Sequence, residues 1–101
     1  MVVIIALSLL RSGWDRYPDA EHPLRAWHQV ATEADWARPT DAVATFGTAS
    51  VLKKGRMVFN IKGNDYRLIV YVRYRTRTVY LKWFGTHAQY DRVDAQTVEK
   101  T

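Results

Sequence analysis

The first half of the chain places apolar residues at helical intervals after one short apolar run. Val2–Ile5 is rich in β-branched residues and predicts a buried strand. Spacings of three and four then predict two helices, one that ends before Pro18 and one in which Asp19 can cap the first turn. A third, short helix is expected in the segment A-R-P-T-D-A-V-A-T-F. The periodic apolar positions are Leu7, Leu10, Trp14 and Tyr17 in the first helix, and Leu24, Trp27, Ala31 and Ala34 in the second.

The second half changes to a period of two, which is typical of strands. Met57–Ile61 predicts one strand, Tyr66–Tyr74 predicts a second with clear alternation, and Val79–Phe84 predicts a third. The segments K-G-N-D and R-T-R-T separate them and predict tight connections, the first with Gly63 and Asn64 at positive φ where the turn needs it. Two tight connections in succession indicate an antiparallel meander.

Together these elements predict one α+β domain over residues 1–101. The N-terminal strand and a helical hairpin are expected to pack on the antiparallel sheet, because one sheet face must be buried. The opening apolar run follows no Lys or Arg and is too short to span a bilayer, so no membrane association is expected. The chain has no cysteine, which excludes a disulfide framework and fits a cytoplasmic protein.

The net charge of +5 is concentrated in residues 53–82, where nine basic residues face a single acid, Asp65. A basic patch on a folded element is typical of nucleic-acid binders, but a solvated sheet face has the same composition. Charge alone leaves both interpretations open. The nine basic residues are Lys53, Lys54, Arg56, Lys62, Arg67, Arg73, Arg75, Arg77 and Lys82.

Three of these cations fall on the sheet face that is predicted to point away from the helices. Arg67, Arg73 and Lys82 alternate there with Tyr71 and Tyr80. Cationic side chains beside aromatic rings hold phosphates and stack on bases, so this face predicts an RNA-binding surface.

The segment G-T-H-A-Q-Y-D follows the last strand and offers groups for acid–base chemistry. Cleavage of RNA through its 2′-hydroxyl needs a base, a cation at the phosphate and an acid for the leaving 5′-oxygen. Histidine suits either proton transfer and arginine suits the phosphate, which makes His87 and Arg67 the candidates. If a helical turn begins here, Asp91 lies four residues after His87 and orients its ring. Tyr90 either stacks on a base, transfers a proton or packs the following segment onto the sheet.

Each candidate also has a structural interpretation. A lone histidine at a strand end is more often structural, and Arg67 can simply pair with a carboxylate of the C-terminal segment. Asn64 is a candidate RNA contact, although an ordinary turn residue is the stronger interpretation. Metal-dependent cleavage needs clustered carboxylates or paired histidines, which the sequence lacks, so neither a metal nor a cofactor is expected.

The run V-F-N-I-K-G-N-D-Y-R-L, followed by G-T-H-A-Q-Y-D, resembles the HigB-type toxins of bacterial toxin–antitoxin pairs, a branch of the RelE-like superfamily. The likeness extends over residues 2–95 and includes the helical segment Y-P-D-A-E-H-P-L-R-A-W-H-Q. It implies a RelE-like fold and a metal-independent mRNA interferase that cuts messages on translating ribosomes. It also implies a HigA-type helix-turn-helix antitoxin as a partner.

The resemblance assigns roles to particular residues. Arg67 matches the sheet arginine at the scissile phosphate, and His87 matches the proton-transferring histidine of related G-T-H endings. Tyr90 occupies the position of a residue near the substrate base, and Lys82 matches a second phosphate-binding cation more loosely. Relatives with a longer catalytic or basic tail differ from this D-A-Q-T-V-E-K-T ending. The second proton-transfer group is therefore open, with Asp91 and Lys62 as candidates. The set of expected phosphate contacts is Lys62, Arg73 and Lys82, with Asn64 as a further RNA contact.

Two other functions fit the same pattern. A non-catalytic inhibitor on the same fold, of the ParE-like gyrase-poison kind, would need neither Arg67 nor His87. A simple RNA-binding module would lose affinity gradually as any basic residue is removed.

Overall fold

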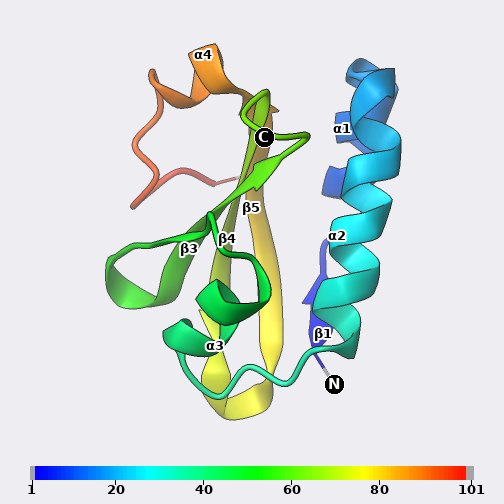
Figure 1. Cartoon of the computed structure of the whole chain (residues 1–101). Coiled ribbons are helices and arrows are strands. Elements are labelled where there is room, and N and C mark those ends of the chain that lie inside the picture. Colours follow the sequence, from blue (N-terminus) through cyan, green and yellow to red (C-terminus); the bar gives the residue numbers. More distant parts are fainter. Residues whose placement is uncertain (1, 100–101) are drawn as a thin grey trace.

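The computed structural model describes residues 2–99, which form a five-stranded mixed sheet with helices on one face. Figure 1 shows α1 and α2 on one side of the sheet and the segment after α4 on the other. No helix in this range is both long enough and apolar enough to cross a membrane. In chain order the elements are β1 (Val3–Ile5), α1 (Ser8–Arg16), α2 (Glu21–Glu33), α3 (Pro39–Thr45), β2 (Ser50–Val51), β3 (Arg56–Ile61), β4 (Tyr66–Arg73), β5 (Thr78–Thr86) and α4 (His87–Tyr90).

The strand order is β1-β5-β4-β3-β2. The predicted meander of β3, β4 and β5 is confirmed, with antiparallel pairing between neighbours. The N-terminal strand β1 joins the sheet at its edge and runs parallel to β5. The two-residue strand β2, which is too short to show a periodicity, was not predicted and closes the other edge. The α+β fold with a helical hairpin against the sheet is therefore as expected.

The hydrophobic core lies between the helices and the sheet and is centred on Phe59 of β3. Its ring centroid lies 5.4 Å from that of Trp27 in α2, 5.9 Å from Trp36 and 5.2 Å from Phe46. Leu24, also in α2, is completely buried in the same core. Burial of these large rings supplies most of the driving force that fixes the helices on the sheet.

A β-bulge in β5 sets which side chains face away from the helices. Ile69 pairs with Trp83 and Val70 pairs with Leu81, so Lys82 is an extra residue between them. Strict alternation after Leu81 would turn Trp83 toward the helices. Instead, Phe84 belongs to the core and Trp83 does not. Opposite the core, the sheet has a second face, called here the outer face.

Two local expectations are wrong. The helix α2 starts after Ala20 without a side-chain cap, because the Asp19 carboxylate instead accepts hydrogen bonds from the side chains of Lys62 and Tyr66. In the turn between β3 and β4, positive φ angles occur at Lys62 (53°) and Gly63 (63°) but not at Asn64. Asn64 therefore has an ordinary backbone, and its side chain has a different role.

Candidate active site and nucleic-acid interface

A capping box fixes the direction in which the chain leaves β5, at the segment Gly85-Thr86-His87. Thr86 is the N-cap of α4, and its Oγ1 accepts a hydrogen bond from the backbone N–H of Gln89 at 3.1 Å. The Gln89 side chain returns a bond, its Oε1 accepting from the backbone N–H of Thr86 at 3.0 Å. The pattern T-H-A-Q is the known signature of this motif. This pattern in the sequence would have indicated that a short helix, and not an irregular segment, follows β5.

Gly85 is required because side chains approach its backbone closely. A Cβ atom built at this position would lie 2.6 Å from Gln89 Oε1 and 2.6 Å from the Trp83 ring. Gly85 pairs with Arg67 across β5 and β4. The glycine thus lets Trp83 and the capping side chain close over the strand directly beside Arg67.

Arg67 is held by the turn that precedes its own strand. Its Nη1 donates to the backbone carbonyls of Asn64 at 3.0 Å and Tyr66 at 3.2 Å, and its Nη2 donates to Asn64 Oδ1 at 2.6 Å. No carboxylate within residues 2–99 forms an ion pair with Arg67. A guanidinium has five N–H donors, so further donors remain for an anion. Asn64 is therefore more than an ordinary turn residue, since it orients Arg67, and its contact with RNA stays a prediction.

His87 is the first residue of α4 and lies beside the same turn. Its backbone N–H donates to the carbonyl of Asp65 at 3.0 Å, which ties α4 to the β3–β4 turn. The side chain is 48% exposed, and its Nε2 lies 3.8 Å from Asp91 Oδ2. That separation exceeds a hydrogen bond. Asp91 is thus near His87 at the predicted spacing but does not hold its ring firmly.

Tyr90 lies between Arg67 and Trp83 and is partly exposed. The Arg67 guanidinium carbon is 5.8 Å from the centre of the Tyr90 ring, a cation–π contact, and the Trp83 ring centre is 6.4 Å away. The group of Arg67, His87 and Tyr90 is called here the open end of the outer face. A phosphate placed at Arg67 would have the Tyr90 ring next to it, and His87 is the first residue of the short helix that carries this ring.

Lys62 points to the helix side of the turn. Its Nζ lies 2.9 Å from Asp19 and 3.5 Å from Asp65. The hydrogen bond to Asp19, followed by the charge of that carboxylate, raises the pKa of Lys62. The Tyr66 hydroxyl donates to the other Asp19 oxygen at 2.5 Å, and this bond, with burial second, raises the pKa of Tyr66 to about 12. A lysine whose pKa is raised stays protonated, which suits a cationic contact and makes it a poor general base and a poor general acid.

Lys82 and Arg73 lie further along the outer face. The side chain of Lys82 is 23% exposed, and its Nζ forms an ion pair with Glu99 at 2.8 Å. Arg73 is exposed at the end of β4. A shallow groove of about 240 Å³ is lined by Tyr71, Arg73, Tyr80 and Lys82, and the two tyrosine rings stack with centroids 5.8 Å apart. The predicted phosphate contacts thus divide between the helix side and the outer face.

Two residues of this surface were not singled out from the sequence. Arg56 of β3 is buried, and its guanidinium shares the Glu99 carboxylate with Lys82, at 2.7 Å. Arg56, Lys82 and Glu99 form what is called here the covered end of the outer face. Glu99 is distant in sequence from both cations, so no local pattern reveals the pairing.

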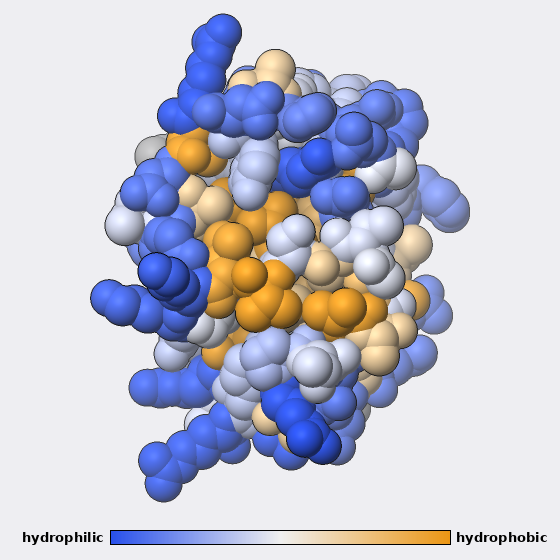
Figure 2. All heavy atoms as spheres, turned by 60° about the vertical axis from the view of Figure 1, so that its left-hand side comes forward, coloured by the Kyte–Doolittle hydropathy of each residue, from blue (hydrophilic) through white to orange (hydrophobic). Residues whose placement is uncertain are grey.

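Figure 2 shows the side of the molecule that lies on the left in Figure 1, away from α1 and α2. Hydrophobic surface in its middle is bordered by strongly hydrophilic side chains. Hydrophilic side chains on this side therefore surround the apolar middle and do not cover it uniformly. Within residues 2–99, no group of three or more His, Asp or Glu side chains is placed to hold a metal ion.

The same residues also carry a family relationship. The model of the HigB toxin family, described as the RelE-like toxic component of a toxin–antitoxin system, matches residues 20–93. The chain belongs to this family. The match includes Arg67, His87 and Tyr90 and ends before the segment that contains Glu99.

Curated HigB proteins are similar over most of their length. The chain is 25% identical over 80 residues to an mRNA interferase HigB of Escherichia coli O6:H1. The aligned residues cover 77% of this chain and 78% of that protein. The chain is 24% identical over 90 residues to the mRNA interferase toxin HigB of Escherichia coli K12, covering 87% and 86%. The open end of this HigB-type toxin lies within the part that the family model matches.

Proposed function

We propose that this HigB-type toxin is an endoribonuclease that cuts mRNA on translating ribosomes without a metal ion. The observation that carries the proposal is the open end. There the turn residue Asn64 presents the Arg67 guanidinium, with the Tyr90 ring beside it and the exposed His87 tied to the same turn. The name mRNA interferase, which the curated relatives bear, supports the same activity.

The open end supplies three of the groups that the reaction needs. The 2′-oxygen of one nucleotide attacks the adjacent phosphorus, and the bond from phosphorus to the 5′-oxygen breaks. Arg67 stabilises the charge that develops on the phosphate oxygens, because it is always ionised and donates from a planar fork. His87 transfers one of the two protons. Tyr90 stacks on the base next to the scissile bond.

The second proton transfer is assigned to a residue near His87. Asp91 lies 3.8 Å from His87 Nε2 and, as a carboxylate, accepts the proton of the 2′-hydroxyl, while His87 protonates the leaving 5′-oxygen. Lys62 is the weaker alternative as the acid, with His87 then acting as the base, because the ion pair with Asp19 raises the pKa of Lys62 and makes its proton harder to release. Arg73 and Lys82 would hold the RNA strand away from the cleaved bond.

The proposed partners follow from the activity and the family. The substrate is mRNA in the ribosome, and the protein acts in the cytoplasm where translation occurs. The family description names a toxin–antitoxin system. A HigA-type helix-turn-helix protein is the proposed antitoxin.

Primer extension on a reporter mRNA in a reconstituted translation system tests the proposal. Wild type is compared with His87→Ala and Arg67→Ala, with and without ribosomes. Arg75→Ala is the matched control, because Arg75 is exposed in the connection between β4 and β5, away from the open end. Both open-end variants should cut at least about 100-fold more slowly, whereas Arg75→Ala should cut nearly as well as wild type.

Intact mRNA with the wild-type protein, or undiminished cutting by His87→Ala, would refute the proposal. DNA breaks in the presence of intact mRNA would instead indicate a gyrase poison. Intact mRNA together with an affinity for RNA that falls gradually in all three variants would indicate a module that only binds RNA.

A further inference from the structure

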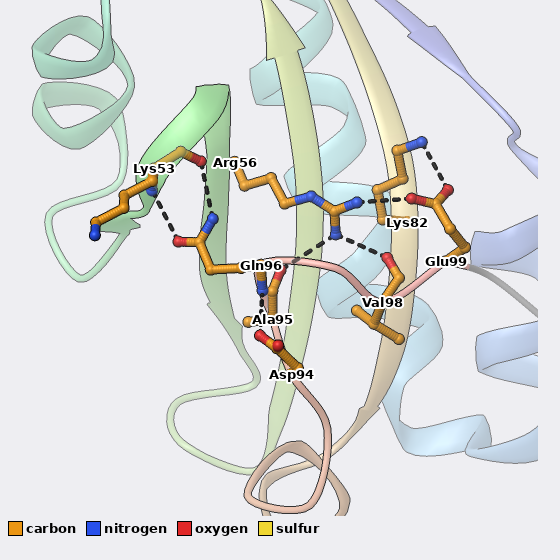
Figure 3. Close-up of polar contacts among 8 residues, drawn as sticks. All are labelled: Lys53, Arg56, Lys82, Asp94, Ala95, Gln96, Val98 and Glu99. Atoms are coloured by element: carbon orange, nitrogen blue, oxygen red, sulfur yellow. Dashed lines mark hydrogen bonds and ion pairs between the residues drawn. The ribbon is translucent and has the colours of Figure 1, made fainter.

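The C-terminal segment crosses the outer face and is fixed there by the backbone of Lys53 and by the side chains of Arg56 and Lys82 (Figure 3). Gln96 exchanges two hydrogen bonds with the backbone of Lys53, at 2.8 and 3.1 Å. The Arg56 guanidinium donates to the carbonyls of Ala95 at 3.2 Å and Val98 at 2.7 Å. The segment thus starts near β2 and ends over β5, where Glu99 meets Lys82.

At the covered end, one carboxylate is held by two cations. Glu99 Oε1 accepts from Lys82 Nζ at 2.8 Å and Oε2 accepts from Arg56 Nη2 at 2.7 Å, as Figure 3 shows. The hydrogen bond from Lys82 is the main cause that lowers the pKa of Glu99, so the group is an anion. Two cations that converge on two oxygens form a site for an oxyanion, and a phosphate of RNA has the same charge and donor requirements.

The surroundings of this site favour RNA over other anions. Lys82 also lines the groove with Tyr71, Tyr80 and Arg73, where two stacked rings and a second cation lie next to it. Tyr71 is the direct cross-strand partner of Arg56. Aromatic faces beside cations are the arrangement that single-stranded nucleic acid uses for stacking and backbone contact.

The covered end is continuous with the open end. Residues 67, 69, 71 and 73 of β4 face the same side, which is about 20 Å of strand at the usual rise per residue. Midway, Ile69 and its partner Val58 are buried although they are not part of the helix-side core. Because the outer face is covered at this point, RNA that reaches Arg67 can extend along β4 toward Lys82 and Arg73 only when the C-terminal segment moves away.

We propose that Arg56 and Lys82 form a second phosphate-binding site for the RNA backbone, which Glu99 occupies in the free protein. RNA must then displace Glu99, and the carboxylate acts as an internal competitor that weakens binding. The inference rests on the proposed function for its ligand, RNA. When a competing group is removed, binding tightens by no more than the free energy of the contact that this group makes. We therefore expect a change in affinity and not in fold.

Binding of a fluorescently labelled 2′-O-methyl RNA, which cannot be cleaved through its 2′-oxygen, tests this proposal. A strand of about 12 nucleotides is long enough for a single domain. Glu99→Gln keeps the shape of the side chain and removes its charge. Asp94→Asn is the matched control, because it makes the same change in net charge within the same segment, where the Asp94 side chain accepts a single hydrogen bond among residues 2–99, from the backbone N–H of Gln96. Thermal unfolding of each variant confirms that it is folded.

Glu99→Gln should bind the RNA at least about fivefold more tightly than wild type, the lower end of typical couplings between competing ligands. Asp94→Asn should differ little from wild type. Lys82→Ala should reduce the slope of log affinity against log salt by about 0.7, the value for one lost phosphate of a single strand. In the Lys82→Ala background, Glu99→Gln should lose part of its benefit, because Lys82 is one of the two cations for which Glu99 and RNA compete.

Equal effects of Glu99→Gln and Asp94→Asn, or a benefit of Glu99→Gln that persists undiminished without Lys82, would overturn the proposal. Unchanged RNA affinity together with tighter binding of poly-glutamate would overturn it too, and would make the site a receptor for protein carboxylates. None of these readouts requires cleavage. Failure of the proposed function would appear instead as intact mRNA in the translation assay, whatever the binding cycle shows.

Discussion

The two ends of the outer face hold their cations in different ways. At the open end, Arg67 is positioned by the neighbouring turn, and its partners are backbone carbonyls and the amide of Asn64. At the covered end, Arg56 and Lys82 are both paired with one carboxylate that comes from far along the chain. The side chain of Arg56 is only 10% exposed.

This difference separates a cation that is ready for an anion from cations that already have one. Neutral partners orient Arg67 without cancelling its charge, which is the arrangement a catalytic guanidinium needs. A carboxylate partner cancels the charge and must be displaced before another anion binds. The open end therefore suits chemistry and the covered end suits regulated binding.

The largest effect is expected when Arg67 keeps its charge but loses its planar fork. Arg67→Lys should lower the rate of cleavage about 100-fold, because an ammonium can neither hold the Asn64 contacts nor offer two parallel donors to the phosphate. Arg73→Lys, at an exposed position of the same strand, is the control and should change the rate much less. Single-turnover cleavage of a ribosome-bound message measures both. Equal rates for Arg67→Lys and wild type would mean that the charge alone is sufficient.

A methyl group at Gly85 should disrupt the open end through packing. Gly85→Ala should lower the free energy of unfolding by about 1–3 kcal/mol, since Trp83 and Gln89 must move to accommodate the new Cβ. Gly47→Ala is the control, because a Cβ there meets no atom within 4 Å. Urea unfolding measures both changes. A neutral Gly85→Ala would show that the capping box is not held as the structure has it.

Loss of the Asn64 side chain should affect cleavage and leave stability nearly unchanged. Asn64→Ala should reduce kcat about tenfold, because a guanidinium without its orienting amide spends less time in the productive position. The KM should change little, because the orientation of Arg67 affects the chemical step more than the binding of the message. A rise in KM with an unchanged kcat would instead make Asn64 a direct RNA contact.

The smallest effect concerns acid stability on the helix side of the sheet. The hydrogen bond from Lys62, followed by that from Tyr66, lowers the pKa of Asp19 below its ordinary value of 3.8. A depressed pKa in the folded state stabilises the protein above the ordinary value, and this stabilisation is lost as the pH falls through the folded value.

Asp19→Asn should therefore be less stable than wild type at neutral pH and should lose less stability between about pH 5 and pH 2. Asp15→Asn is the control, because Asp15 has no ion pair within residues 2–99. Urea unfolding at a series of pH values gives both curves. Parallel curves for Asp19→Asn and wild type would contradict the assignment.

The sequence was sufficient where a structure depends on local periodicity. The helical hairpin, the three meander strands and the outer-face position of Arg67 and Lys82 follow from spacings of three, four and two. It was not sufficient where a side chain finds a distant partner. Asp19 looked like a helix cap, but Lys62 and Tyr66 lie across the fold and bind it.

The same distinction applies to the candidate site. Gly85, Thr86 and His87 form a local motif, and their place at the end of β5 was predictable. The contact between Asn64 and Arg67 depended on which turn residues have a positive φ. Lys62 has the positive φ that was expected at Asn64. The pairing of Arg56 with Glu99 spans 43 residues, so no spacing rule could reveal it.

The most direct test of the division between the two ends compares Arg67→Ala with Lys82→Ala in single-turnover cleavage on saturating ribosome–mRNA complexes, with affinity measured separately. The account predicts that Arg67→Ala lowers the saturated rate at least about 100-fold with a small change in affinity. It predicts that Lys82→Ala mainly weakens affinity and its salt dependence. A saturated rate that falls as far for Lys82→Ala as for Arg67→Ala would contradict it, because the covered end would then take part in the chemical step.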